Sequence, residues 1–197
     1  MELLRPTESE RWAKFKSGDN DTLSMIYGEN SKKLYQYGLK LTPNHSIIED
    51  AIQELFCDLV RNRKNLGDTN NIQFYLIKSF KRKLLRQLQK EKRYNLKDSD
   101  EEYTFEITYS IEHDIIIEEK SNQKIYLLHE AIKNLSPRQK EVVYLKYTLE
   151  LEYDEIAEIM DMSIESCRNL IYRSIKSLKD SFQANGALVL FFFKNLT

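Results

Sequence analysis

The sequence contains little glycine or proline, with 5 Gly and 3 Pro among 197 residues. Folds rich in β-hairpins and loops use these two residues at their many turns, so the shortage argues against such folds. Apolar residues recur instead at the three- and four-residue spacing of helices, which also argues against disorder throughout. The composition therefore predicts an all-α protein.

Potential metal ligands are also scarce, since the chain has 2 Cys and 3 His. No pair of them has metal-ligand spacing, and no glycine-rich phosphate loop is present. We therefore expect no metal, no cofactor, no catalytic residues and no enzymatic activity. Cys57 and Cys167 fall within helical apolar patterns, so we expect two buried thiols and a reducing compartment.

Long apolar runs are missing as well. The longest, Ala187–Phe193, has seven residues, whereas a membrane helix needs about 20. The first ten residues are charged and lack the apolar centre of a signal peptide. We expect a cytoplasmic protein without membrane insertion.

The net charge of -1 conceals two segments of opposite sign. Lys78–Arg93 contains eight basic residues and one acidic residue, whereas Asp98–Glu119 contains nine acidic residues and no Lys or Arg. Separate fields of this kind favour binding of a polyanion to the basic segment.

Periodicity and turn residues predict two helical domains joined by an acidic linker. The expected divisions are 1–94, a linker at 95–120, a helix-turn-helix domain at 121–182 and an apolar tail at 183–197. In the first domain, helices are expected after Asp21, from Ser46 to about Asn65, and from about Ile72 to Tyr94. Pro43 and the segment Gly67–Asn71 mark the breaks between them.

The second domain carries a specific helix-start signal at Ser136-Pro137-Arg138-Gln139. Ser caps the helix, Pro fits its first position, and Gln can bond back to the cap. After a helix from Ser121 to about Asn134, we expect helices at Pro137–Tyr147, Tyr153–Met160 and Ser163–Phe182, with a turn at Asp161-Met162. Two helices joined by such a turn form the geometry of a major-groove reader.

The last helix is amphipathic. Its apolar side holds Ile164, Cys167, Leu170, Ile171, Ile175 and Leu178. Its polar side holds Glu165, Ser166, Asn169, Tyr172, Arg173 and Lys176, with Arg168 at the edge. The polar side chains suit contacts to base edges and phosphates, although an ordinary helical hairpin with a solvated face shows the same pattern.

The helix from Ile72 also has two faces. Ile77, Phe80, Leu84 and Leu88 share the apolar side, and the opposite side holds Tyr75, Lys78, Arg82, Arg86 and Arg93. Basic residues with an aromatic ring suit a phosphate backbone and an unstacked base. A merely solvated helix usually interleaves Glu with Lys, and here Glu is absent until Glu91.

The order of these parts resembles a known family. The stretches Leu135–Tyr147, Leu151–Met160 and Ser163–Arg173 resemble the fourth domain of bacterial sigma factors. Upstream, Glu49–Phe56 resembles the polymerase-docking helix of their second domain. With no recognisable third domain between them, the chain is similar to the extracytoplasmic-function (ECF) branch.

The resemblance implies a role for each matching residue. Contacts to the β′ coiled coil of core RNA polymerase are implied for Asp50, Gln53, Glu54 and Phe56. The β flap of the polymerase is a further partner that the resemblance implies. Binding of the minus-ten promoter element falls to Asn70, Asn71, Tyr75, Lys78, Arg82 and Arg86, with the two Asn side chains in the loop that captures an unpaired base. Reading of the minus-thirty-five element as duplex falls to Glu165, Ser166, Arg168, Asn169, Tyr172, Arg173 and Lys176.

Two departures from the family pattern concern the DNA-reading domain. Asp161-Met162 replaces the frequent Gly of the turn, and Asp tolerates the left-handed conformation better than most residues. Leu170 stands where relatives often have Arg. With few basic residues on the polar face, we expect weak DNA affinity from this domain alone.

Several alternatives remain open from the sequence. The acidic linker is either a solvated connector or a nucleic-acid mimic within polymerase channels, through Asp98, Asp100, Glu101 and Glu102. The tail packs on the fourth domain, or binds an anti-sigma factor or another copy. The rival functions are a free-standing helix-turn-helix regulator and an adaptor that binds only protein.

Overall fold

The computed structural model describes residues 6–94, 104–107 and 130–182, without the side chains of residues 92–94 and 182. Every regular element in these ranges is a helix, as the sequence predicts. Contacts divide the chain into two compact units, Met1–Glu101 and Glu102–Thr197. The expectations for Asp98, Asp100, Glu101 and Glu102, for a helix starting at Ser121, and for the apolar tail lie outside the described residues.

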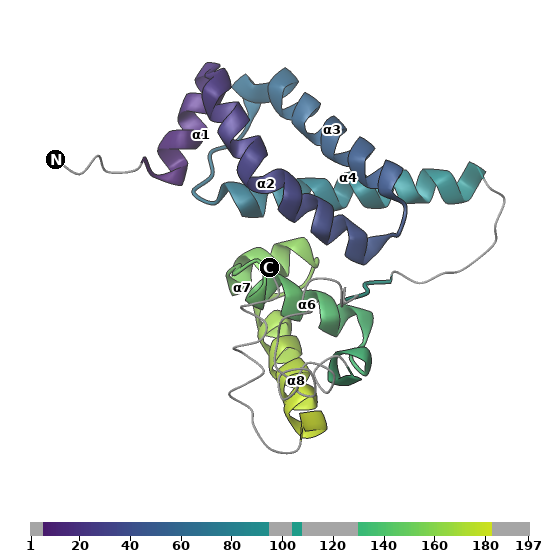
Figure 1. Ribbon diagram of the computed structural model, residues 1–197. Coiled ribbons are helices and arrows are strands. Elements are labelled where there is room, and N and C mark those ends of the chain that lie inside the picture. The colour runs from purple at the N-terminus through teal and green to yellow at the C-terminus, as the bar shows by residue number, and fades with distance from the viewer. Residues whose placement is uncertain (1–5, 95–103, 108–129, 183–197) are drawn as a thin grey trace, which may run out of the picture. The chain divides into compact units, whose positions relative to one another are not determined.

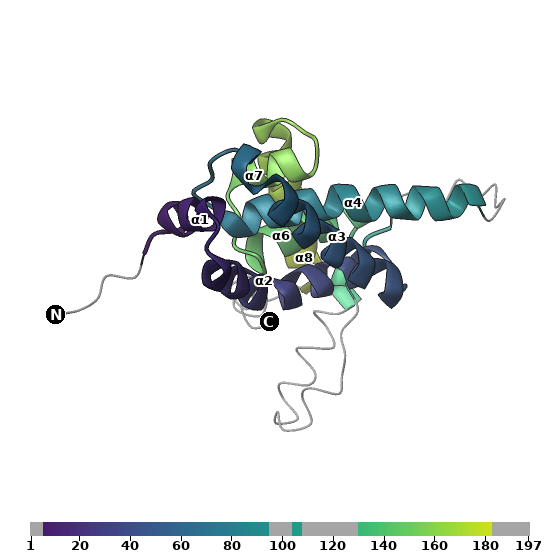
Figure 2. The same ribbon diagram turned by 90° about the horizontal axis from the view of Figure 1, so that it is seen from above.

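The N-terminal unit is a packed group of helices (Figure 1). Its elements are α1 (Glu8–Ser17), α2 (Asn20–Leu41), α3 (His45–Asn62), the 3₁₀ helix η1 (Arg63–Asn65) and α4 (Ile72–Tyr94). The predicted α4 is confirmed to the residue, and α3 with η1 covers the helix expected to end near Asn65. The carboxyl-terminal part of α4 extends beyond the other three helices (Figure 2).

Local chemistry explains where these helices begin. Thr7 and Glu10 form a reciprocal capping box at α1, and Asp19 accepts hydrogen bonds from the backbone N–H groups of Asp21 and Thr22 in the first turn of α2. Asn44 caps α3 by accepting from the backbone N–H of Ile47 at 3.3 Å. These bonds satisfy N–H groups that a helix leaves without an internal partner.

The core lies where α2, α3 and α4 pack together, around the fully buried Leu34, Ile48 and Phe80. Gly38 lies at this crossing, inside the last turn of α2, which ends at Leu41. A Cβ atom on Gly38 would lie 2.8 Å from Cγ2 of Ile48, closer than packed carbon atoms approach. The missing side chain therefore permits the close approach of α2 and α3.

The expectation that both cysteines are buried is wrong for Cys57, which is exposed on α3, whereas Cys167 is buried. Cys57 is nine positions after the buried Ile48, which places it about 180° around the helix. Its neighbours Leu55 and Leu59 face the core, and Cys57 faces away from it.

The C-terminal unit contains the helical residues 130–133, α6 (Pro137–Tyr147), α7 (Tyr153–Ile159) and α8 (Ile164–Phe182). The predicted capping box is confirmed, because Ser136 Oγ accepts from the backbone N–H of Gln139 and the Gln139 side chain accepts from that of Ser136. The helices pack around Val143, Leu145, Ile156, Cys167 and Leu178, all fully buried.

Residues 104–107, inside the predicted linker, pack on this unit. Phe105 is fully buried, with its ring 5.8 Å from that of Tyr144 on α6. The neighbouring Glu106 pairs with Lys140 at 2.9 Å. Burial raises the pKa of Tyr144 to about 12. This part of the predicted linker therefore contributes to the core of the C-terminal unit.

Candidate nucleic-acid and polymerase interfaces

Helices α7 and α8 are joined by a tight turn at Met160–Ser163. Asp161 has φ 51°, the left-handed conformation expected for it, and the backbone N–H of Met162 bonds to the carbonyl of Ala157 at 3.0 Å. Ser163 then caps α8, since its Oγ accepts from the backbone N–H of Ser166 at 3.1 Å. The structure thus confirms the predicted helix-turn-helix without a glycine in its turn.

The inner face of α8 fixes the orientation of the helix. Cys167 and Leu178 are fully buried, and Ile171 is 4% exposed. Leu170 and Ile175 are half-buried, as the predicted apolar side requires. Ile164 departs from the prediction at 44% exposed. It is the first residue of α8, and a helix end has fewer neighbours to cover it.

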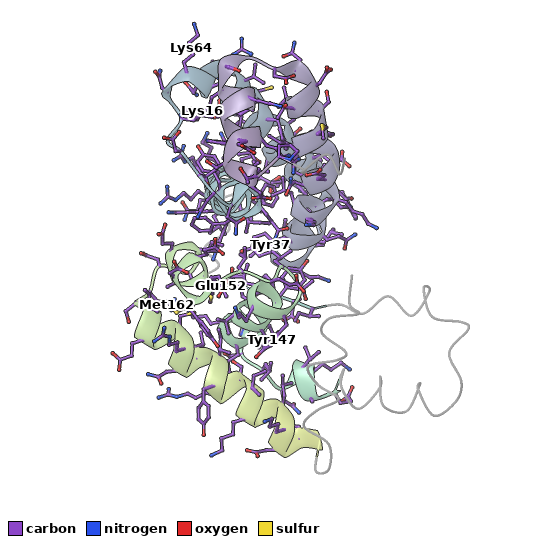
Figure 3. All side chains as sticks on the ribbon, turned by 90° about the vertical axis from the view of Figure 1, so that its left-hand side faces the viewer. Lys16, Tyr37, Lys64, Tyr147, Glu152 and Met162 are labelled. Atoms are coloured by element: carbon purple, nitrogen blue, oxygen red, sulfur yellow. The ribbon has the colours of Figure 1, made fainter. Side chains whose placement is uncertain are left out.

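The outer face of α8 is open along its length. Figure 3 shows side chains projecting from the side of α8 turned away from α6 and α7. Exposed on this helix are all seven residues assigned to the minus-thirty-five element: Glu165, Ser166, Arg168, Asn169, Tyr172, Arg173 and Lys176. Tyr172 is 70% exposed, and the Arg168 guanidinium lies 5.6 Å from the centre of the Tyr153 ring.

A hollow of about 490 Å³ lies beside the second half of this face. It is lined by Arg173, Lys176, Ser177, Asp180 and Ser181. Two cations and two hydroxyl groups suit a phosphate oxygen, although Asp180 partly offsets the charge.

Helix α4 presents the basic residues of the N-terminal unit. Its apolar side is confirmed, with Ile77, Phe80 and Leu84 buried. On the opposite side Arg82 and Arg86 are exposed, and the Lys78 ammonium lies 5.5 Å from the centre of the Phe74 ring. The side chain of Arg93 lies outside the described residues.

Tyr75 is partly committed to packing. Its ring centre lies 4.9 Å from that of Trp12 on α1, and burial raises the pKa of its hydroxyl. Trp12 therefore covers part of the Tyr75 ring, and only the remaining part of the ring is accessible to a ligand.

The two asparagines before α4 have different surroundings. Asn70 is exposed. Asn71 caps α4, because its Oδ1 accepts from the backbone N–H of Phe74 at 2.9 Å. Asn70 is therefore the side chain better placed to meet an unpaired base.

The residues assigned to polymerase binding lie along α3. Asp50, Gln53 and Glu54 are exposed and close in helical register. Phe56 is 8% exposed and packs edge-on against Tyr27, with ring centres 4.9 Å apart. The structure therefore brings the three polar residues together on the surface, whereas Phe56 is buried below them against Tyr27.

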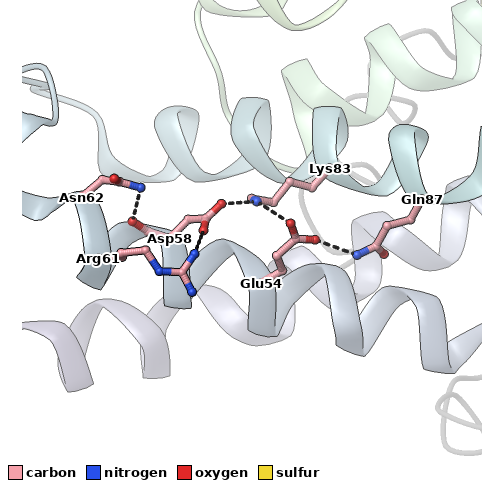
Figure 4. Close-up of polar contacts among 6 residues, drawn as sticks. All are labelled: Glu54, Asp58, Arg61, Asn62, Lys83 and Gln87. Atoms are coloured by element: carbon pink, nitrogen blue, oxygen red, sulfur yellow. Dashed lines mark hydrogen bonds and ion pairs between the residues drawn. The ribbon is translucent and has the colours of Figure 1, made fainter. Parts of the chain in front are cut away.

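Glu54 is engaged within the unit by Lys83 of α4 (Figure 4). The Lys83 ammonium pairs with Glu54 at 3.2 Å and also with Asp58, and the Gln87 side chain donates to Glu54 at 2.9 Å. The hydrogen bonds from Lys83 lower the pKa values of both carboxyl groups. Burial opposes the charge of Lys83, but its bonds to Asp58 and Glu54 outweigh burial and raise its pKa.

A groove of about 1000 Å³ runs between α2 and α3 beside this face. Its walls are Tyr27, Ser31, Lys32, Tyr35, Glu49, Ile52, Gln53, Phe56, Cys57, Val60 and Arg61. Tyr27 and Val60 are 48% and 42% exposed. The sequence prediction did not include this groove, and it placed Cys57, one of the lining residues, in the core. The exposed Val60 lies about 120° around α3 from the buried Ile48.

Among the described residues, no group of three or more His, Cys, Asp or Glu side chains is arranged to hold a metal ion. No described helix is both long enough and apolar enough to cross a membrane.

Two family profiles match the chain, one in each unit. Residues 26–94 match Sigma-70 region 2, and residues 125–178 match Sigma-70, region 4. Together they cover more than half of the chain. No curated protein sequence matches significantly. The region 2 match disfavours a free-standing helix-turn-helix regulator, which has no use for a polymerase-docking domain.

Solved structures show the same fold. The sigma factor RpoE of Bartonella quintana, solved with the anti-sigma factor NepR, has a TM-score of 0.57 and 16% identity, covering 84% of this chain and 97% of that one. CnrH, solved with the cytosolic domain of CnrY, has a TM-score of 0.54 and 13% identity, covering 89% and 96%. Both are all-α.

Sigma factors are transcription initiation factors rather than enzymes. With region 2 and region 4 on separate helical units, this chain belongs to the sigma-70 family of RNA polymerase sigma factors.

Proposed function

We propose that α3 binds core RNA polymerase, that α4 with the preceding loop holds the melted minus-ten element, and that α8 reads the minus-thirty-five element as duplex. The observation that carries this proposal is the combination, in one packed unit, of an exposed acidic and amide face on α3 with exposed arginines on α4. A protein that only reads duplex DNA needs neither. We place this activity in the cytoplasm, where the polymerase is.

In the polymerase contact, Asp50 and Gln53 make the main polar interactions. Glu54 already binds Lys83 and Gln87, so a contact from polymerase to Glu54 must replace those bonds and adds little binding free energy. The groove beside them receives apolar side chains of the partner on Tyr27, Phe56 and Val60.

Promoter melting in this proposal is a binding process. An unpaired base in the Asn70 loop and phosphates on Arg82 and Arg86 stabilise the open strand, so nucleotide hydrolysis by this chain is not required. Arg173 and Lys176 on α8 add duplex contacts. Because the outer face of α8 carries few cations, binding of both units to one promoter supplies the affinity.

The primary test is gel filtration of the full chain with core RNA polymerase, followed by transcription from a promoter library. Co-elution and initiation at a defined promoter class are expected, and absence of co-elution overturns the proposal. Asp50→Ala should weaken the complex about tenfold, the loss of about one good polar contact. Asp21→Ala, which removes an exposed carboxylate from α2, is the matched control.

Cys57 offers a direct probe of the groove. Its thiol is exposed and lines the groove, whereas Cys167 is buried. Reaction with a bulky maleimide should block polymerase binding, and Cys57→Ser should remove the block. Full binding by the labelled protein would exclude this groove from the interface.

We further propose that the same groove binds a regulatory protein in competition with polymerase. Support comes from its exposed apolar walls and from the relative solved with the anti-sigma factor NepR. A regulator that binds the maleimide-labelled protein as tightly as the unlabelled one would overturn this assignment.

A further inference from the structure

Helix α1 directs one stripe of side chains at the loop formed by residues 66–71. Glu8, Trp12 and Lys16 are spaced by four, so they lie on one side of the helix. Each of them bonds to this loop or to the residue that follows it. The sequence gives no indication of these bonds, because their partners are 52 to 64 positions away.

The central bond joins Trp12 to the loop backbone. The indole Nε1–H donates to the carbonyl oxygen of Gly67 at 2.8 Å. Trp12 is 1% exposed, and its ring also packs against Phe15 and Tyr75. Packing in the core requires only an apolar ring, whereas the N–H group of Trp12 forms a hydrogen bond to Gly67, an exposed residue of the loop.

The two outer bonds hold the loop on either side. Glu8 Oε2 accepts from the backbone N–H of Ile72 at 2.7 Å, where the loop enters α4. The Lys16 ammonium pairs with Asp68 at 2.7 Å. Asp68 is 93% exposed, so this pair is the weakest of the three.

The loop is also braced internally. Thr69 Oγ1 donates to the carbonyl of Asn71 at 2.9 Å and accepts from its backbone N–H at 3.1 Å, and Asn71 caps α4. Asn70 is the exposed residue between these two braced positions. The backbone on both sides of Asn70 is therefore fixed before any ligand arrives.

We propose that Trp12, with Glu8 and Lys16, acts as a set of positioning residues that pre-organises the 66–71 loop for capture of an unpaired base at Asn70. This inference rests on the proposed function of that loop. Fixing the loop in advance removes an ordering cost that binding would otherwise carry, which increases affinity without a direct contact to DNA. These three residues are not DNA ligands in this scheme.

The sharpest variant is Trp12→Phe, which keeps an aromatic ring in the core and removes the N–H. The probe is a forked DNA with a six-nucleotide unpaired stretch, selected from a randomised pool for binding to the polymerase holoenzyme containing the unaltered chain. We expect about five- to tenfold weaker binding of the fork, the equivalent of one hydrogen bond. Binding of fully duplex DNA should be unchanged.

Two further readouts separate positioning from general destabilisation. Backbone amides of residues 67–71 should exchange hydrogen faster in Trp12→Phe, while those of α3 should keep their protection. Lys16→Met removes the pair with Asp68 without disturbing the core, so it should weaken fork binding less than Trp12→Phe does. Lys16→Arg keeps the positive charge and should retain fork binding. The proposal would be overturned if the loss of fork binding simply paralleled the fall in the thermal unfolding midpoint of each variant while hydrogen exchange of the loop amides stayed unchanged.

Asn70→Ala distinguishes this inference from the proposed function. If Asn70→Ala weakens fork binding and neither Trp12→Phe nor Lys16→Met does, base capture stands and the positioning role is wrong. If Asn70→Ala has no effect on fork binding, the assignment of the loop to base capture is itself wrong, and the positioning role falls with it.

Discussion

The ammonium group of Lys83 on α4 lies 3.2 Å from the carboxylate of Glu54 on α3, so the helix assigned to DNA and the helix assigned to polymerase share an ion pair. Lys83 also pairs with Asp58, and its side chain is 16% exposed. A partly buried cation with two carboxylates restrains the relative register of the two helices.

Replacing Lys83 by Met should destabilise the N-terminal unit by about 1 kcal/mol near neutral pH, a modest loss because both carboxylates retain contact with water. Trp12 is the single Trp of the chain and is buried in this unit, so its fluorescence during urea unfolding reports the loss. Lys90→Met, at an exposed position of the same helix, should change stability little.

The effect of Lys83→Met should depend on pH. Folding lowers the pKa values of Glu54 and Asp58 below 4.5 and 3.8, so their stabilisation is present above those values and is lost as pH falls through the folded-state values. Folding raises the pKa of Lys83 above 10.5, so its stabilisation is lost only as pH rises beyond that. The difference between variant and parent should therefore shrink in acid, and a constant difference down to about pH 2 would contradict the ion-pair account.

The two glycines inside α2 should respond oppositely to the same substitution. At Gly38 a Cβ would lie 2.8 Å from Ile48, and Gly38→Ala should cost about 1–3 kcal/mol through overpacking. At Gly28 nothing lies within 4 Å, and Gly28→Ala should stabilise by about 0.5–1 kcal/mol through helix propensity. Trp12 fluorescence measures both, and equal effects would show that α2 and α3 do not cross at Gly38.

Phe105→Ala should destabilise the C-terminal unit by about 3–5 kcal/mol, the usual cost of emptying a buried aromatic site. In far-UV circular dichroism, the C-terminal unit should then unfold at a lower denaturant concentration, while the Trp12 fluorescence transition of the N-terminal unit stays in place. Glu106→Gln is the matched control, since it removes only the pair with the Lys140 ammonium and should cost less than about 1 kcal/mol. An unchanged dichroism transition in Phe105→Ala would show that residues 104–107 are a mere connector.

Arg173→Ala should weaken duplex binding by about 1–3 kcal/mol if the side chain reads a base. A library of duplexes in a binding-and-sequencing assay measures the effect at each position. Lys179→Ala removes a cation from α8 at the edge of the reading face and should give a smaller loss. Equal weakening across all sequences would reassign Arg173 to a phosphate.

The turn residue Asp161 offers a test of backbone strain. Its φ of 51° suits Gly better than any L-residue, so Asp161→Gly should be neutral or stabilise by about 0.5 kcal/mol. Asp161→Val should destabilise by about 1–2 kcal/mol, because a β-branched side chain is crowded in this conformation. Chemical unfolding of the C-terminal unit followed by circular dichroism ranks the two, and the reverse order would contradict the left-handed turn.

The sequence by itself determined the features that depend on near neighbours. The start of α6 follows from Ser136, Pro137 and Gln139, whose bonds span three residues. The left-handed turn at Asp161 and the limits of α4 follow from equally local signals. Helical periodicity also identified the buried faces of α4 and α8, apart from Ile164. It contained enough to place Cys57 outside as well, since that position lies opposite Ile48.

Only the tertiary structure decided which exposed-looking side chains already have partners. Lys83 reads as one more cation of a basic helix, yet it holds two carboxylates of α3. Trp12 is buried in the core, yet its indole N–H bonds to a loop 55 positions away. Phe105 reads as part of an acidic linker, yet it is buried against α6. Such pairs depend on how whole helices pack, and packing brings together residues that no local spacing relates.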